Sequence, residues 1–157
     1  GGICGWNMLR NIEDCFNMGN VYSSGSSSLK YVGGITGRAT NSTINACYNI
    51  GKVYSGSSSA NLGGILAYSS DSSVLNSYYY KSGNEYVAGG TVCTRENMWE
   101  QVTFAGFDFT NTWTMTGNTD YFYPELKDLP FEYSHEITST VISPESVQKY
   151  YIKSLHE

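Results

Sequence analysis

The residue types best suited to catalysis are few in this chain and form no catalytic pattern. A carbohydrate-active enzyme needs paired carboxylates, or an acidic calcium site with a basic residue, on one exposed face. The chain contains repeated segments, and the acids Glu13, Asp14 and Asp71 are each replaced by a non-acidic residue at the equivalent position of the other repeats. His135 and His156 lie in no His-Glu-x-x-His motif, and no Gly-x-Ser-x-Gly motif occurs. We therefore predict a chain with no catalytic residues, no metal site and no cofactor.

Two of the four cysteines fall at matching places in a repeated phrase. Cys15 and Cys47 would have their Cα atoms about 4.8 Å apart if the repeats stacked as parallel strands, which is within reach of a disulfide. Ser77 fills the third equivalent position, which favours two buried free thiols packed as small hydrophobic groups. The disulfide stays open as the alternative. The cysteine spacing matches no metal-binding motif.

Fourteen tyrosines are the other notable group, because exposed aromatic rings can stack on sugars. Tyr22 and Tyr54 align in successive repeats and are predicted to form an outward pair. In the run 78–80, neighbouring side chains of a strand alternate between faces, so we expect one ring, that of Tyr79, to face outward. These three residues are the candidate ligand-facing aromatics. The alternative is that aromatic ladders stabilise the wall itself, which cross-strand pairs do on any face of a sheet.

The elements that must position these side chains are repeats. A Gly-Gly-Ile phrase occurs at residues 1–3, 33–35 and 63–65, at steps of 32 and 30 residues. A period in this range is typical of stacked units that bury their apolar faces against their neighbours. The segments between the phrases are short, rich in β-branched and aromatic residues, and bounded by Gly, Asn and Ser, which predicts strands. Because Ile12 and Cys15 are three residues apart, both can face inward only if a bulge or corner lies between them.

The glycine pairs and the serine tracts are predicted to have structural roles. The Gly-Gly pairs supply either positive φ at a corner or room for one backbone to approach the next. The serine-rich stretches 23–28, 55–59 and 69–73 are expected to be solvated turns.

The pattern changes from residue 94 onward. Thr94 can cap a short helix through residues 95–99. The apolar residues of 104–109, followed by Trp113 and Met115, alternate in pairs as they do in strands. We expect this aromatic-rich segment to cover the exposed end of the stack, because the end of a stack leaves an unpaired strand edge. Farther on, residues 137–142 are predicted to be a strand and 143–155 a helix that begins at Ser143 and Pro144.

The composition limits the classes of partner. The net charge is −5, and the nine basic residues are scattered, which argues against binding to nucleic acid. No basic amphipathic stretch or long apolar run indicates a membrane partner. The chain begins inside a repeat, so we expect it to be part of a longer protein.

The repeated phrases resemble the GLUG repeat of bacterial surface and secreted proteins, which also occurs beside the catalytic part of IgA-cleaving metallopeptidases. That family has Gly-Gly-Ile/Leu-x-Gly, then Ile-x-x-Cys-Tyr/Phe-Asn, then Gly-x-Val, and residues 33–37, 44–49 and 51–53 match these elements. The third repeat departs at Ala67 and Ser77 and lacks the final Gly-x-Val. The resemblance covers residues 1–126. It implies a β-solenoid on an extracellular bacterial protein, without catalytic residues.

The predicted fold is therefore all-β: a right-handed parallel β-solenoid (β-helix) of about three coils, with an aromatic C-terminal cap and a short C-terminal helix. Residues 1–93 would be the repeats, 94–130 the cap, and 131–157 a tail or the start of a linker. The predicted function is a non-catalytic adhesion or spacer module, secreted or on the cell surface, that presents a Ser/Asn/Tyr-rich wall to a host protein or glycan. One alternative is an accessory, substrate-positioning region of a large extracellular peptidase. The other is a carbohydrate-active β-helix enzyme.

Overall fold

The structure is a computed structural model that describes residues 1–24, 30–81, 89–115 and 122–129. These residues form short strands and turns, with two single-turn 3₁₀ helices and no α-helix among them. The expected all-β class, with parallel sheets, is confirmed. The strand predicted at 137–142 and the helix predicted at 143–155 lie outside the described residues.

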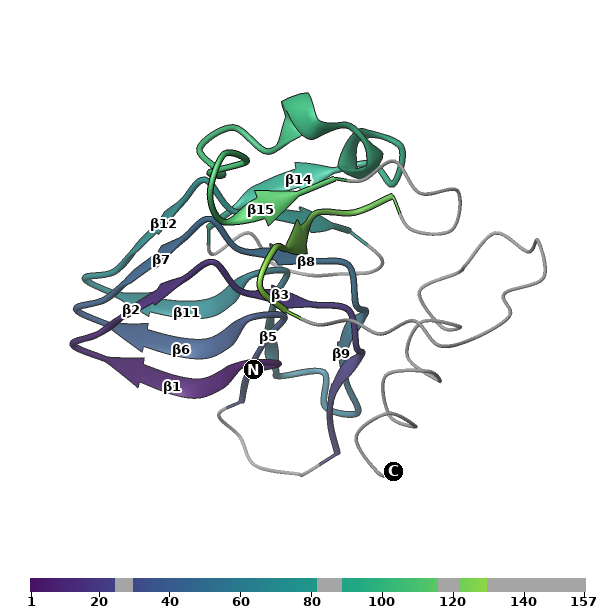
Figure 1. Cartoon of the computed structure of the whole chain (residues 1–157). Coiled ribbons are helices and arrows are strands. Elements are labelled where there is room, and N and C mark those ends of the chain that lie inside the picture. Colours follow the sequence, from purple (N-terminus) through teal and green to yellow (C-terminus); the bar gives the residue numbers. More distant parts are fainter. Residues whose placement is uncertain (25–29, 82–88, 116–121, 130–157) are drawn as a thin grey trace, which may run out of the picture.

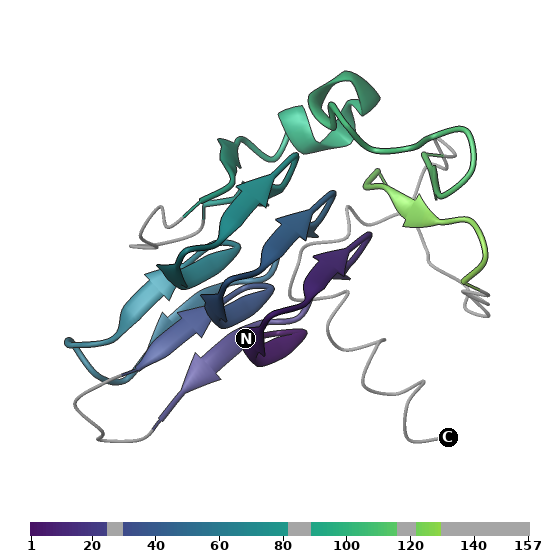
Figure 2. The same ribbon diagram turned by 90° about the vertical axis from the view of Figure 1, so that its left-hand side faces the viewer.

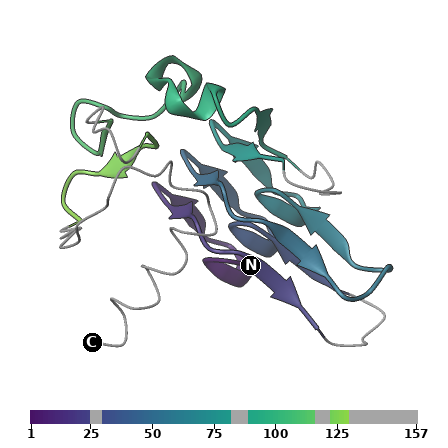
Figure 3. The same cartoon turned by 90° about the vertical axis from the view of Figure 1, so that its right-hand side faces the viewer.

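The three repeats supply equivalent strands that pair side by side in parallel (Figure 1). One sheet contains β1 (Cys4–Met8), β6 (Thr36–Thr40) and β11 (Leu66–Ser70), and a second contains β2 (Asn11–Glu13), β7 (Thr43–Asn45) and β12 (Ser73–Leu75). A third contains β3 (Phe16–Asn17), β8 (Tyr48–Asn49), β13 (Tyr78–Tyr80) and β14 (Thr91–Cys93). Two smaller sheets pair β4 (Val21–Ser23) with β9 (Val53–Ser55), and β5 (Tyr31–Gly33) with β10 (Asn61–Gly63). Seen from two further directions, the repeats form tiers of parallel strands (Figures 2 and 3).

The pairing register joins equivalent residues of successive repeats. The Ile3 N–H donates to the Ile35 carbonyl at 2.9 Å, and the Ile35 N–H donates to the Ile65 carbonyl at 3.0 Å. Ile12 pairs with Ile44, which in turn pairs with Val74. The alignment read from the sequence is therefore the spatial register of the strands.

Left-handed corners recur at fixed places in each repeat. Asp14, Ala46 and Asn76 have φ values of 50°, 51° and 43°, between the second and third strands of their repeats. The corner expected between Ile12 and Cys15 is thus confirmed. It lets Ile44 and Cys47 reach the same core although they are three residues apart.

The Gly-Gly pairs are needed for close approach and not for positive φ. A Cβ on Gly34 would lie 2.1 Å from the Gly64 carbonyl oxygen and 2.3 Å from Asn49 Nδ2. A Cβ on Gly64 would lie 2.0 Å from the ring of Tyr79. Since neither glycine has positive φ, close approach is the one of the two predicted roles that the structure supports.

The described core consists of two clusters on opposite faces of the β3–β8–β13 sheet. The inner cluster lies within the turns of the chain and contains Ile35, Ala39, Ile44, Cys47, Ile65, Leu66 and Tyr79. The outer cluster contains Met18, Ala46, Tyr48, Ile50, Tyr78, Met98, Phe104, Phe107, Trp113 and Tyr123. Successive side chains of a strand point to opposite faces of the sheet, so Tyr78 lies in the outer cluster and Tyr79 in the inner one.

The aromatic segment packs along one side of the stack, where it contacts all three repeats. It comprises η1 (Asn97–Trp99), η2 (Gln101–Thr103), β15 (Trp113–Thr114) and β16 (Glu125–Leu126). Its aromatic rings contact the outward column formed by Phe16, Tyr48 and Tyr78, one residue from each repeat. These apolar rings point away from the inner core, so they need a cover of their own. Among the described residues, β11 and β12 are the last strands of their sheets, while β14 pairs with the edge of β13.

The strand prediction for this segment is confirmed at Trp113, which lies in β15, but it is wrong over residues 104–109. These residues form turns, because Gly106 has a φ of 87° and Asp108 accepts hydrogen bonds from the N–H groups of Thr110 and Asn111 at 2.9 and 3.0 Å. Thr94 Oγ1 accepts a hydrogen bond from the Asn97 N–H at 3.1 Å, but the N-cap residue of η1 is Glu96, which makes no side-chain capping bond.

Candidate binding surface

The acids of the repeats have partners within the fold. Asp14 Oδ1 accepts a hydrogen bond from Trp113 Nε1 at 2.8 Å, which ties the aromatic cover to the first repeat. Glu13 Oε1 faces Asn11 Nδ2 at 3.5 Å, and Asp71 Oδ2 faces Ser70 Oγ at 3.4 Å. The described part of the chain holds no group of three His, Cys, Asp or Glu residues that could bind a metal ion. His135 and His156 lie outside the described residues.

The cysteines that the sequence aligned are free thiols, as predicted. Cys15, Cys47 and Ser77 each donate to the carbonyl two residues earlier, at 3.1, 3.2 and 2.7 Å, which explains why serine can replace cysteine in this column. A hydrogen bond with the Cys47 thiol lowers the pKa of Cys15 to about 7, against opposing effects of burial and of Asp14. The same bond, together with burial, raises the pKa of Cys47. Cys15 is therefore the thiol of the pair that ionises first.

Tyr22 and Tyr54 form the outward aromatic pair that the alignment predicted. They are register partners on β4 and β9, and their rings stack with centroids 4.7 Å apart and an interplanar angle of 28°. Tyr22 is 52% exposed and Tyr54 38% exposed. Lys52 Nζ lies 5.7 Å from the centre of the Tyr54 ring, which adds a cation beside the pair.

The assignment of Tyr79 as a ligand-facing residue is wrong. Its side chain is fully buried in the inner cluster, where it packs over Gly64. Its register partner is Asn49, whose amide also faces inward and accepts a hydrogen bond from Asn17 Nδ2 at 2.8 Å. Tyr79 thus continues an inward asparagine column, whereas its neighbour Tyr78 points to the outer cluster.

A second exposed ladder, not identified from the sequence, crosses the outside of the β1–β6–β11 sheet. Trp6, Arg38 and Tyr68 are register partners on the three strands. The Arg38 guanidinium carbon lies 4.6 Å from the centre of the Trp6 ring and 5.4 Å from that of Tyr68, so the cation is held between two aromatic rings. The Tyr31 ring lies 4.6 Å from the Tyr68 ring and extends the surface. Trp6 is 54% exposed and Tyr68 is 37% exposed.

The signal for this ladder was present in the alignment. Trp6, Arg38 and Tyr68 each stand five residues after the first glycine of a repeat. The column is not uniformly apolar, so a search for matching hydrophobic positions passes over it. A search for large planar side chains in one column would have found it.

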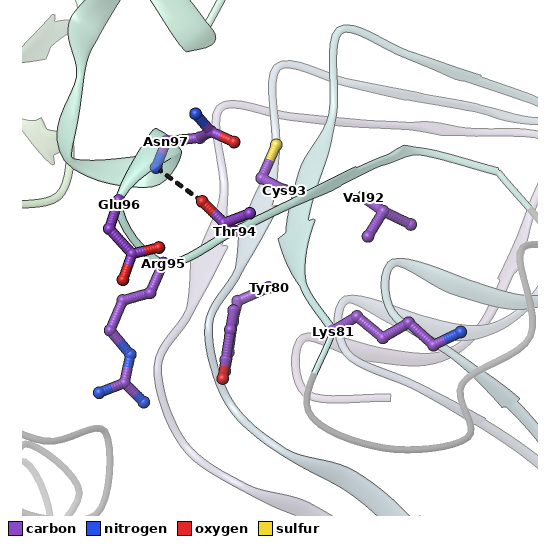
Figure 4. A pocket seen from close by; sticks show the side chains of 8 residues that line it. All are labelled: Tyr80, Lys81, Val92, Cys93, Thr94, Arg95, Glu96 and Asn97. Atoms are coloured by element: carbon purple, nitrogen blue, oxygen red, sulfur yellow. Dashed lines mark hydrogen bonds between the residues drawn. The ribbon is translucent and has the colours of Figure 1, made fainter.

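A pocket of about 650 Å³ lies where β13 and β14 meet η1. It is lined by Tyr80, Lys81, Val92, Cys93, Thr94, Arg95, Glu96 and Asn97, and Lys81 and Arg95 lie to either side of Tyr80 (Figure 4). Hydrogen bonds from its own backbone and from Thr94, with a smaller effect of Arg95, hold the pKa of Glu96 below its ordinary value. This pocket therefore carries a carboxylate beside its cations, whereas the ladder through Arg38 carries none.

Comparisons with known proteins give no relative for this chain. No family model matches it, no curated protein matches it, and no solved structure matches it. No helix within the described residues is long and apolar enough to cross a membrane.

Proposed function

We propose that this chain is a right-handed β-solenoid module of a secreted or cell-surface bacterial protein, and that its outer wall binds a glycan or a host protein without catalysis. Three features support the proposal. The first two are the parallel in-register pairing of equivalent strands and the resemblance to surface repeats. The third is that Asp14, an acid of the repeats, accepts a hydrogen bond from Trp113 and so has a structural role. A stack of this kind presents one set of side chains again in every layer, which suits contact with an extended partner.

The observation that carries the binding role is the exposed stacked pair of Tyr22 and Tyr54. Aromatic rings left in solvent, in register and beside the cation of Lys52, offer an apolar face with polar hydroxyl tips. A sugar ring has the complementary character, since it presents C–H groups on its faces and hydroxyls around its edge. The pair also stabilises its own sheet, so the test must separate binding from folding.

A glycan array and pull-down of host proteins with the purified chain test this role. We expect a bound glycan or host protein to be lost when Tyr22 and Tyr54 are both changed to Ala, because the ring faces are removed. The matched control changes both to Phe, which keeps the rings and the stack, and should keep most of the binding. Arrays and pull-downs without any bound partner would contradict the binding role and leave only a spacer.

A further inference from the structure

We propose that the ladder formed by Trp6, Arg38 and Tyr68 is a second binding site, and that it takes the carboxylate of an acidic glycan. The inference rests on the proposed function, to which it adds a separate site and a chemical class of ligand.

The position of Arg38 leaves its hydrogen-bonding groups unused. The guanidinium lies between the Trp6 and Tyr68 rings at 4.6 and 5.4 Å, and its side chain makes no hydrogen bond or ion pair with the described residues. The Nε atom is buried without a partner. A guanidinium stacked between rings keeps its terminal N–H groups in its own plane, where a carboxylate can accept two of them side by side.

The surroundings of Arg38 make this cation distinct within an acidic chain. Two other described cations have polar partners: Lys127 Nζ donates to the carbonyls of Phe109 and Thr110 at 3.0 and 2.6 Å, and Arg95 lies beside Glu96. Lys30 Nζ also has no hydrogen-bond partner, but Lys30 is only 7% exposed and is not stacked between two exposed rings as Arg38 is. The ladder column contains no acid, and neither do its neighbours on the same strands. Because the net charge of the chain is −5, attraction of an anion to this surface must come from a local cation, and Arg38 is that cation.

The aromatic neighbours favour a glycan over an acidic peptide. Trp6 and Tyr68 are exposed on either side of the cation, and Tyr31 adds a third ring 4.6 Å from Tyr68. An acidic sugar has its carboxylate attached directly to a ring whose faces carry C–H groups. One such residue can therefore reach the cation and an aromatic surface together, whereas a Glu side chain offers a carboxylate on a flexible chain.

The test is calorimetric titration of the chain with defined oligosaccharides. The acidic probes are hexagalacturonate, a hyaluronan hexasaccharide and α2,8-linked trisialic acid. The uncharged match is fully methyl-esterified hexagalacturonate, and decaglutamate is the acidic peptide. We expect an acidic glycan to bind, its methyl ester or neutral form to bind at least about tenfold more weakly, and added salt to weaken binding.

Substitutions of Arg38 test whether the acidic glycan binds at the ladder. Arg38→Gln should weaken the acidic glycan about tenfold or more, and Arg38→Lys should also weaken it, because Lys keeps the charge but loses the planar pair of donors. The control, Lys81→Gln, removes one exposed positive charge outside the ladder and should leave this binding unchanged. Circular dichroism of each variant checks that the sheet is retained.

The outcomes separate this inference from the proposed function. Binding of a neutral glycan that is lost when Tyr22 and Tyr54 are both changed to Ala but kept in Arg38→Gln supports the proposed function and overturns the acidic-glycan site. Tighter binding of decaglutamate than of every acidic glycan also overturns it. No binding of any probe, charged or neutral, would count against both.

Discussion

At the scale of single residues, each column of the stack is defined by the hydrogen bond or contact that its members share. Cys15, Cys47 and Ser77 all donate to the carbonyl two residues earlier, so thiol and hydroxyl are interchangeable there. Asn17 and Asn49 form an amide ladder in the neighbouring column. A substitution within a column can therefore change the reactivity of a side chain without changing the fold. The ionisation of the Cys15 thiol beside Cys47 tests this.

We predict that Cys15 reacts with iodoacetamide as a thiol with a pKa of about 7. Its thiolate accepts a hydrogen bond from Cys47, so the ionised fraction grows as the pH rises through 7 and levels off by about pH 8 to 9. An ordinary cysteine, with a pKa of about 8.5, is about half ionised at that pH and still gains reactivity as the pH rises further. Alkylation rates at Cys15, followed by peptide mass spectrometry from pH 6 to 9, measure this midpoint.

Two substitutions at Cys47 provide the comparison. Cys47→Ala removes the donor, which returns the pKa of Cys15 toward its ordinary value and slows alkylation at pH 7 roughly fivefold to tenfold. Cys47→Ser keeps an O–H donor, as the chain itself does at Ser77, and should preserve the low midpoint. Equal rates in the two variants would rule out the Cys47 hydrogen bond as the cause.

At the scale of elements, the distance between successive repeats is set by glycines. Gly34 lies against the Gly64 carbonyl and the Asn49 amide, with no space for a methyl group. We predict that Gly34→Ala lowers the free energy of unfolding by about 3 kcal/mol, because strand backbone or the buried amide must move. Urea denaturation followed by circular dichroism measures the change.

Gly5 is the matched control for this prediction. It lies in β1 of the same stack, but a Cβ there would meet no atom within 4 Å. Gly5→Ala should therefore change the free energy of unfolding by no more than about 0.5 kcal/mol. If Gly5→Ala were as destabilising as Gly34→Ala, a general loss of backbone freedom, and not close packing, would be the cause.

At the scale of the whole molecule, the aromatic cover joins all three repeats into one unit. Trp113 is fully buried, contacts Phe16 and Tyr48, and donates to Asp14, which is 99 residues earlier in the chain. Tyr48 and Tyr78 donate to the Pro124 and Ala105 carbonyls at 2.6 and 2.9 Å. These long-range contacts predict that the cover and the repeats unfold together.

We predict that Trp113→Phe lowers the free energy of unfolding by about 1.5 kcal/mol, because it removes a donor to a carboxylate. The loss should appear in a single transition shared by tryptophan fluorescence and circular dichroism. Asp14→Asn is the control, since an amide oxygen still accepts this bond and the equivalent Asn76 adopts the same left-handed φ. Two separate transitions would show that the cover unfolds independently of the repeats.

Much of the repeat region follows from the sequence, and the aromatic cover does not. The alignment of Ile3, Ile35 and Ile65 predicts the register, and the three-residue spacing of Ile12 and Cys15 predicts the corner at Asp14. For the candidate surface, the alignment found Tyr22 and Tyr54 but misjudged Tyr79. A strand of consecutive tyrosines does not by itself show which ring faces inward, whereas the inward position of its partner Asn49 does.

The sequence by itself determined which residues are equivalent, because similar short segments that pair in parallel align their apolar positions in only one register. Only the tertiary structure decided which columns are buried on the second face of the β3–β8–β13 sheet, since that depends on where the segment after residue 94 packs. It also decided that Arg38 lies between Trp6 and Tyr68 without a carboxylate. Such contacts depend on the distances between strands and on side-chain directions, and sequence spacing alone does not specify either.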